Sequence, residues 1–84
     1  MPRFRIRHFE TPAGRDPILE FLEDLPDFDR AACNQVIKRL ETGEIDNHPR
    51  NRDYVGDSIW ELRVGFSGKQ YRFLYATEGD EAFI

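Results

Sequence analysis

The stretch that decides the fold is Trp60-Glu61-Leu62-Arg63-Val64-Gly65-Phe66-Ser67-Gly68-Lys69-Gln70-Tyr71-Arg72-Phe73-Leu74-Tyr75. Two runs of alternating side chains flank Ser67-Gly68, and a glycine-bearing break between such runs predicts a β-hairpin. With a two-residue turn, residue 66 faces 69 and residue 60 faces 75. One face of the hairpin then collects the apolar side chains, which are Trp60, Leu62, Val64, Phe66, Tyr71, Phe73 and Tyr75.

The same register places Arg63 directly opposite Arg72 on the other face of the hairpin. Like charges directly opposite each other destabilise a strand pair. The pairing therefore predicts a site where an anion lies between two guanidinium groups. An alternative stays open, because Glu61 shares that face and both arginines could bind it in an ordinary structural Arg–Glu–Arg cluster.

Two helices are expected before the hairpin. Asp16-Pro17 is typical of a helix start, with an Asx N-cap followed by proline at the first helical position, and Pro26 ends the helix. Apolar residues at helical spacing predict a second helix from Asp27 or Asp29 to about Thr42. We expect the two helices to form an antiparallel pair that covers the apolar face of the sheet.

The remaining segments complete an α+β fold with the order β-α-α-β-β-(β) and an antiparallel twisted sheet. Residues 3–10 alternate as a strand, with Phe4, Ile6 and His8 on one side and His8 at the edge of the core. Residues 44–58 are polar and are expected to form a long loop. Residues 81–84 are expected to begin a further strand, so that residues 1–84 form one domain that is cut short in its last strand.

Composition limits the function. The chain has 84 residues, 39% of them hydrophobic and 33% charged, and contains no apolar run of the ~20 residues needed to cross a bilayer. The N-terminus has no signal-like segment, so we expect a cytoplasmic protein without a membrane partner. Cys33 is the one cysteine, and His8 and His48 are too isolated to suggest a metal site. No metal or other cofactor is expected.

The charge is polarised along the chain. A net charge of −4 argues against nucleic-acid binding when taken alone. Residues 16–29 hold six acidic residues and no basic one, whereas residues 1–7 hold Arg3, Arg5 and Arg7 and no acidic one. Arg5 and Arg7 could extend the open face of the hairpin if the first strand joins the sheet in the expected parity, and solvated charges at the sheet edge explain them equally well.

Several segments together resemble a known toxin family. They are the helix from Asp16 to Pro26, Arg52-Asp53-Tyr54-Val55-Gly56-Asp57, Ile59-Trp60-Glu61-Leu62-Arg63 and Tyr71-Arg72-Phe73-Leu74-Tyr75. These segments, together with the order of a strand, two helices and an antiparallel meander, resemble the RelE/ParE superfamily of toxin–antitoxin toxins. The sequence of these segments resembles the phage-derived, HigB-like branch of that superfamily more closely still, and the similarity spans nearly the whole chain.

The resemblance implies a small, metal-free endoribonuclease, an mRNA interferase that cuts mRNA on the ribosome. A helix-turn-helix antitoxin would neutralise it. Arg72 matches the position where the family commonly carries a phosphate-contacting arginine, and Arg63 joins it as a catalytic candidate through the strand pairing. His48 is a third candidate, as a general acid or base near neutral pH. The alternative reading of His48 is a turn residue before Pro49.

Four further residues are candidates for RNA binding. Arg50, Arg52 and Lys69 could contact phosphates, and Tyr54 could stack on a base. A solvated loop explains the three cations equally well. Members of the family usually continue into a basic C-terminal tail with catalytic or RNA-contacting side chains. A natural truncation is therefore expected to be impaired or inactive, whereas the activity is expected in full if the sequence is a fragment.

Two other functions stay open. One is a non-catalytic binding module on the same fold, either bound by the antitoxin or acting on a protein such as gyrase, as ParE-type toxins do. The other is an accessory phage protein without enzymatic activity, for which no residue offers positive support.

Overall fold

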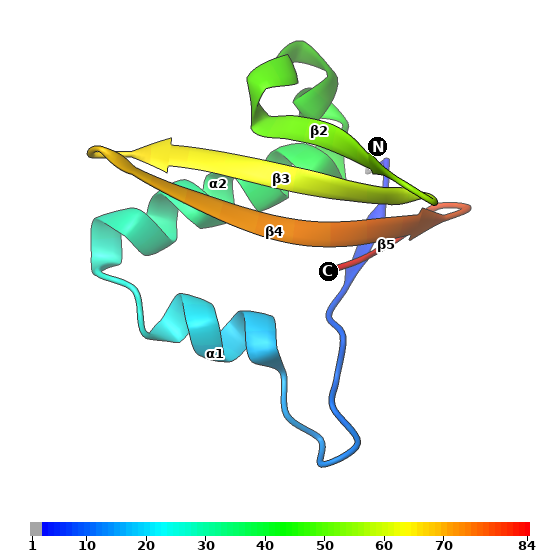
Figure 1. The fold of residues 1–84 in the computed structure, drawn as a ribbon, viewed down its shortest axis with the longest axis horizontal. Helices are drawn as coiled ribbons and strands as arrows, with labels where there is room; N and C mark the ends of the chain where they lie inside the picture. The colour runs from blue at the N-terminus through cyan, green and yellow to red at the C-terminus, as the bar shows by residue number, and fades with distance from the viewer. Residues whose placement is uncertain (1–2) are drawn as a thin grey trace.

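The computed structural model describes residues 3–84 as a five-stranded sheet with two helices packed on one face (Figure 1). The strand order in the sheet is β1-β5-β4-β3-β2. In chain order the elements are β1 (Arg5–Arg7), α1 (Pro17–Glu23), α2 (Asp27–Thr42), the short 3-10 helices η1 (Glu44–Asn47) and η2 (Pro49–Asn51), β2 (Arg52–Gly56), β3 (Ile59–Phe66), β4 (Lys69–Glu78) and β5 (Glu81–Phe83). The α+β fold predicted from the sequence is confirmed.

The β3–β4 hairpin has the predicted register. Phe66 faces Lys69, and Trp60 faces Tyr75. Ser67 and Gly68 both have positive φ, 51° and 79°, as a type I′ turn requires at its two central positions. This turn has a twist that matches the twist of the two strands, so the pairing continues without a break from the turn to Ile59 and Ala76.

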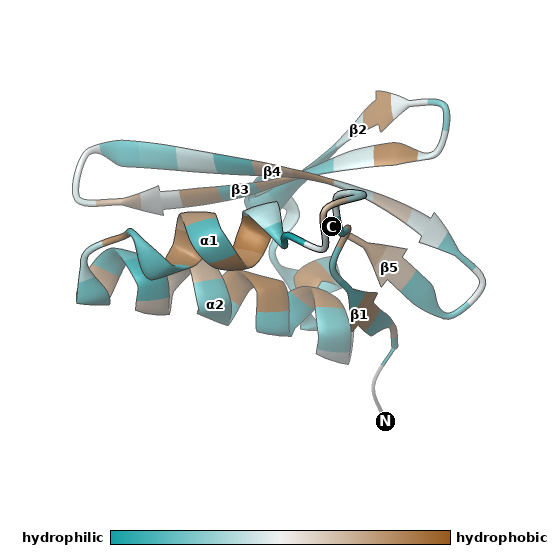
Figure 2. Cartoon of the chain, turned by 90° about the horizontal axis from the view of Figure 1, so that it is seen from below, coloured by the Kyte–Doolittle hydropathy of each residue, from teal (hydrophilic) through white to brown (hydrophobic). Residues whose placement is uncertain are grey.

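The core lies between one face of the sheet and α2. Leu62, Val64, Phe73 and Tyr75 are buried on that face. From the other side α2 and η1 contribute buried side chains, which are Cys33, Val36, Leu40 and Ile45. Figure 2 shows apolar residues recurring along both helices and β3. Burial of each large apolar side chain contributes about 1.5–3 kcal/mol to folding, so this layer is the main source of stability.

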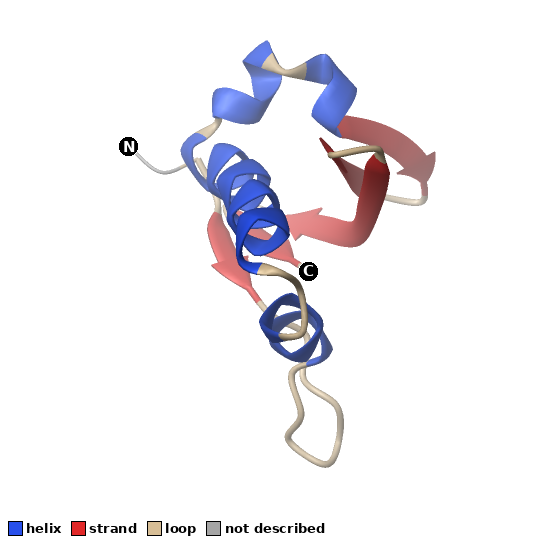
Figure 3. Ribbon diagram, turned by 90° about the vertical axis from the view of Figure 1, so that its left-hand side faces the viewer, coloured by secondary structure: helices blue, strands red, loops and turns tan. Residues whose placement is uncertain are grey.

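The two helices begin and end near the predicted residues. The Asp16 carboxylate accepts a hydrogen bond from the Leu19 backbone N–H at 3.0 Å, which caps α1. α2 begins at Asp27 and ends at Thr42, where Gly43 adopts a left-handed φ of 84°. The helices run in roughly opposite directions (Figure 1), and Figure 3 shows α1 set beside α2 rather than over the middle of the sheet.

Residues 44–58 are not a loop, and this prediction is wrong. Two 3-10 turns bury Ile45 completely, and residues 52–56 form β2 at the edge of the sheet. An edge strand has a mostly solvated surface, so it lacks the apolar alternation by which a strand is recognised. In β2 only Arg52 and Gly56 are partly buried.

The first and last strands pair in parallel, which makes the sheet mixed and not purely antiparallel. Arg5 faces Glu81 and Arg7 faces Phe83. The strand predicted at residues 81–84 is confirmed, but β1 is shorter than the predicted 3–10. The strand ends at Arg7, although the Phe9 backbone N–H still donates to the Ile84 carbonyl at 2.9 Å. The partly exposed His8 ring then places Nδ1 2.7 Å from the Asp16 carboxylate instead of lying at the core edge.

β5 covers only the end of β4. Its three residues pair with Ala76, Thr77 and Glu78. Within residues 3–84, no strand pairs with the preceding part of β4, residues 69–75, on the side away from β3. That side of β4 is therefore an unpaired strand edge, and the Phe21 ring of α1 lies in edge-to-face contact with the rings of Tyr71 and Phe73.

The start of β4 is joined to α2 by a buried acid. The Tyr71 hydroxyl donates a hydrogen bond to the Asp29 carboxylate, which is only 6% exposed, and Lys69 Nζ lies 3.6 Å from the same carboxylate. The hydrogen bond to Asp29 raises the pKa of Tyr71 from 10.0 to about 12, with burial as the second cause.

This shift predicts a loss of stability at high pH. The folded state favours the neutral phenol, so Tyr71 stabilises the fold fully below pH 10, and this contribution disappears as pH rises to about 12. Urea unfolding of the wild type should therefore show a falling free energy of unfolding between pH 10 and 12. The fall should be smaller in Tyr71→Phe. Equal pH dependence in the two proteins would contradict the assignment.

Two glycines give a matched test of backbone strain. Gly43 and Gly14 have nearly the same φ, 84° and 80°, so alanine at either position costs roughly 1–2 kcal/mol from the backbone alone. At Gly43 a Cβ atom would also meet the Cβ and Cδ atoms of Arg3 at 3.3 Å, whereas at Gly14 it would meet open space. Chemical denaturation should show that Gly43→Ala is the more destabilising change.

Candidate functional site

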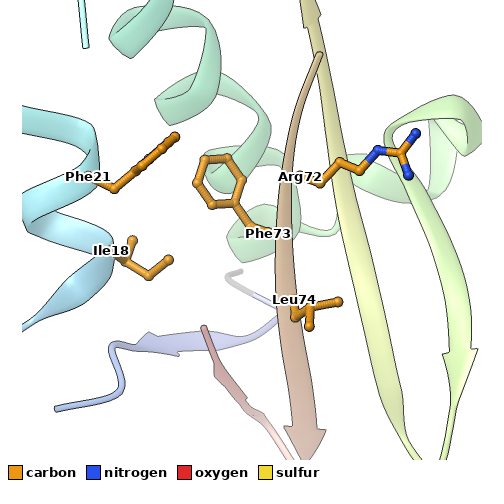
Figure 4. A pocket seen from close by; sticks show the side chains of 5 residues that line it. All are labelled: Ile18, Phe21, Arg72, Phe73 and Leu74. Atoms are coloured by element: carbon orange, nitrogen blue, oxygen red, sulfur yellow. The ribbon is translucent and has the colours of Figure 1, made fainter. Parts of the chain in front are cut away.

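The face of the sheet turned away from the helices carries the predicted arginine pair. Arg63 and Arg72 are direct cross-strand partners, and both alternate with buried residues that face the helices. Figure 4 shows the Arg72 side chain pointing away from α1, while Phe73 points toward α1. We call this side of the sheet the open face. Around the arginine pair its residues are Asp53, Glu61, Arg63, Gln70, Arg72 and Leu74.

Two carboxylates hold Arg63 in place. Its Nε donates to Glu61 Oε1 at 2.9 Å, and its NH2 group donates to Asp53 Oδ2 at 3.0 Å. Arg72 NH1 lies 3.8 Å from the same Glu61 oxygen. The hydrogen bond to Glu61 raises the pKa of Arg63 from its ordinary value, and the charges of Asp53 and Glu61 add to the effect. The Arg–Glu–Arg arrangement considered from the sequence is therefore present in the free protein.

The cluster is balanced in charge but unequal in exposure. Two guanidinium groups lie beside two carboxylates, and Glu61 is the least exposed of them, with 16% of its side chain accessible. The Arg72 side chain is 57% exposed, and its NH2 group donates to Gln70 Oε1 at 3.1 Å. An incoming phosphate would meet Arg72 first and would compete with Glu61 for both arginines.

A chain of hydrogen bonds supports Arg63 from the backbone side. The Asn51 amide donates to the Arg63 carbonyl at 2.9 Å and accepts from Arg39 NH1 at 3.0 Å. Asn51 ends η2, and Arg39 lies in the last turns of α2. The segment expected to be a loop therefore ties α2 to β3 at the level of the site.

Three of the proposed RNA-binding residues lie on the side of the sheet that faces the helices. Arg52 and Tyr54 alternate with Asp53 in β2, and both surround Trp60, with the Arg52 guanidinium 5.3 Å and the Tyr54 ring 4.8 Å from it. Lys69 extends toward the buried Asp29. The structure does not bring these three residues to the arginine pair.

His48 and Arg50 lie in the segment of 3-10 turns. His48 follows η1, and its Nε2 lies 3.6 Å from a Glu44 carboxylate oxygen. Arg50 is exposed within η2. Within residues 3–84, no hydrogen bond or ion pair joins either residue to Arg63 or Arg72. Their proposed roles in catalysis and RNA binding stay predictions.

The sequence interpretation missed one side chain of the arginine cluster. Asp53 binds Arg63 from β2, a strand that was expected to be loop. A signal was available, since Tyr54-Val55 favours a strand and Gly56-Asp57-Ser58 favours a turn. Asp57 and Ser58 indeed have positive φ, 53° and 64°.

Arg5 and Arg7 lie on the face of the sheet that the sequence analysis considered for them. In the register with β5, Arg5 and Arg7 lie on the same face as Glu81 and Phe83, which is the open face. Both arginines contact the Glu81 carboxylate. The basic N-terminus thus extends this face at the opposite end of the sheet from the hairpin turn.

No cluster of three or more metal-ligating side chains was found in the part of the chain that the structure describes. The same residues include no helix that is long and apolar enough to cross a bilayer.

The two carboxylates should differ in how strongly they protect Arg63. Glu61→Gln replaces the charge-assisted bond to Nε with a weaker neutral one, while Asp53→Asn leaves the Nε bond intact. We therefore expect hydrogen exchange of the Arg63 Nε–H, measured by NMR, to accelerate more in Glu61→Gln than in Asp53→Asn. The reverse order would mean that Asp53 is the main partner.

Comparison with known proteins gives a match to a protein-family model. The family model described as phage derived protein Gp49-like (DUF891) matches residues 20–84, a range that includes most of α1, all of α2, the hairpin and the arginine cluster. No match was found among curated proteins or among solved structures. The chain belongs to the Gp49-like phage-derived family, a family of toxin–antitoxin toxins related to RelE/ParE.

Proposed function

We propose that this chain is the toxin of a HigB-like toxin–antitoxin pair and acts as a metal-free endoribonuclease on ribosome-bound mRNA. A helix-turn-helix antitoxin is the proposed partner, and the cytoplasm is the proposed site of action. The observation that carries this proposal is the pairing of Arg63 with Arg72 on the open face. Membership in a toxin family supports the proposal independently.

The arginine pair suits the chemistry of RNA cleavage. In a metal-free mechanism the 2′-OH gives up its proton to a base and its oxygen attacks the adjacent phosphorus, while the bond from phosphorus to the 5′-oxygen of the next nucleotide breaks. The 5′-oxygen leaves with a proton, a 2′,3′-cyclic phosphate remains, and negative charge grows on the phosphate oxygens in the transition state. Guanidinium groups can hold the phosphate in a defined orientation and stabilise this charge. Arg72 is the more exposed of the two and would make the first contact.

In the proposed mechanism a phosphate replaces Glu61 as the partner of the two arginines. In the free protein its carboxylate occupies the space between the two guanidinium groups, at 2.9 Å from one and 3.8 Å from the other. A phosphate that binds both arginines would take over these contacts. Glu61 would then be left beside the reacting group, where it could accept a proton.

A second candidate function is a non-catalytic binding module on the same fold. The engagement of Arg63 by two carboxylates favours it, because a guanidinium that is already neutralised attracts phosphate less strongly. In this case the chain would form a tight complex with its antitoxin or act on a protein target, without cutting RNA.

Cleavage of mRNA in a purified translation system tests the proposal. If Arg72 stabilises the transition state, Arg72→Ala should lower the cleavage rate by roughly 100-fold or more, as removal of a single charge-stabilising donor does in other enzymes. Arg15→Ala is the matched control, because Arg15 is an exposed arginine that pairs with Glu20 on the helix side of the molecule. This control should cleave at the wild-type rate.

Two outcomes would contradict the proposal. Wild-type protein that binds a helix-turn-helix antitoxin but leaves ribosome-bound mRNA intact would favour the binding module. Equal cleavage by Arg72→Ala and wild type would remove Arg72 from the mechanism.

A further inference from the structure

A small apolar hollow lies on the open face beside the arginine cluster. Its volume is about 350 Å³, and the residues that line it come from different parts of the chain; they are Phe9, Ile59, Leu74, Tyr75, Ala76, Phe83 and Ile84, of which Tyr75 and Ile84 belong to the buried core. Phe9 follows β1, Ile59 begins β3, Leu74 and Ala76 lie in β4, and Phe83 ends β5. The hollow therefore spans the sheet from β3 to the end of β1.

The strand register explains why the surface is hollow at this place. Ile59, Ala76 and Phe83 are direct neighbours across three adjacent strands. Ala76, the middle residue, has only a methyl side chain, so the larger side chains of its neighbours project further from the sheet and leave a depression over it. Phe9 closes one side, where its backbone N–H donates to the Ile84 carbonyl at 2.9 Å.

The side chains around the hollow are unusually exposed for their type. Phe9 is 61% exposed, Leu74 60% and Phe83 40%. Single exposed apolar residues are common, but a contiguous group around a depression usually marks a binding site. These three residues do not belong to the core.

Cations border the hollow on two sides. Arg72 lies two residues before Leu74 on the same face of β4, about 7 Å away along the strand. Arg7 faces Phe83 in the β1–β5 register, with its guanidinium bound to Glu81. An apolar surface next to an anion-binding arginine matches the two chemical parts of a nucleotide, a planar base and its phosphate.

We propose that this hollow binds a nucleobase of single-stranded RNA, adjacent to the phosphate that Arg72 contacts. This inference rests on the proposed function, because it places a second part of the same substrate. Stacking of a base on exposed aromatic rings adds affinity without requiring a particular sequence. The exposed phenylalanines are suited to such stacking, and in β4 Leu74 lies between Arg72, which pairs with Arg63, and Ala76, which pairs with Phe83.

The test uses a short 2′-O-methyl RNA that contains 2-aminopurine and cannot be cleaved. Stacking in the hollow should quench the fluorescence of the modified base. Phe9→Ala should weaken binding about tenfold and abolish the quenching, in line with the loss of one base-stacking contact. Phe28→Ala is the matched control, since Phe28 is 79% exposed but lies on α2, on the other side of the sheet. It should behave as the wild type.

A second probe distinguishes contacts to the base from contacts to the phosphate. An oligonucleotide with an abasic site in place of 2-aminopurine should bind wild type and Phe9→Ala equally well, while Arg72→Ala should weaken binding of both probes. Leu74→Ser provides a further variant if Phe9→Ala proves unstable, because Leu74 is also exposed.

The possible failures can be told apart. Unchanged binding and quenching in Phe9→Ala and Leu74→Ser, with cleavage still dependent on Arg72, would overturn the base site and leave the proposed function standing. Absence of both RNA binding and cleavage in the wild type would overturn both. If the variants lose the antitoxin but keep the RNA, the hollow is a protein-binding site and the inference is wrong.

Discussion

The pairing register of β3 with β4 is the constraint on which the rest of the molecule depends. The two-residue turn at Ser67-Gly68 sets this register, and both of its residues adopt the positive φ angles that match strand twist. Because side chains alternate between faces, a shift by one residue would bring Arg63 under the helices and expose Leu62. The hydrophobic core and the arginine cluster therefore have a common origin.

The arginine cluster itself is a compromise between folding and binding. Two guanidinium groups on neighbouring strands repel each other, and in the free protein Glu61 and Asp53 offset that repulsion. The same carboxylates lower the attraction of the site for other anions. A net charge of −4 is consistent with this arrangement, since the positive charge at the site is local and largely compensated.

Local patterns were sufficient to predict much of the fold. The Asx cap at Asp16, the glycine after Thr42 and the hairpin alternation each depend on neighbouring residues, and each appears in the structure where expected. β2 was missed because an edge strand with both sides partly solvated has no apolar period. The parallel pairing of β1 with β5 was also missed, since it joins residues more than seventy positions apart.

The candidate site could be predicted only as far as the hairpin extends. Arg63 and Arg72 belong to one local unit, so their parity follows from the turn alone. The positions of Arg52 and Tyr54 depend on how β2 pairs, which is a tertiary feature. Lys69 is different, because it faces Phe66 in the predicted register and its place on the apolar face follows from the turn; only its approach to Asp29 is tertiary. Asp53 enters the site through that same pairing.

The uncovered side of β4 between Lys69 and Tyr75 has a consequence for behaviour in concentrated solution. Backbone groups along this segment that point away from β3 have no partner strand within residues 3–84, and an unpaired edge of this kind can template pairing with an extended chain, including the same segment of another molecule. Lys69 and Arg72 place positive charges along it, and two copies meeting at this segment would bring those charges together. Charged side chains on an edge strand are a known protection against edge-to-edge pairing between sheets.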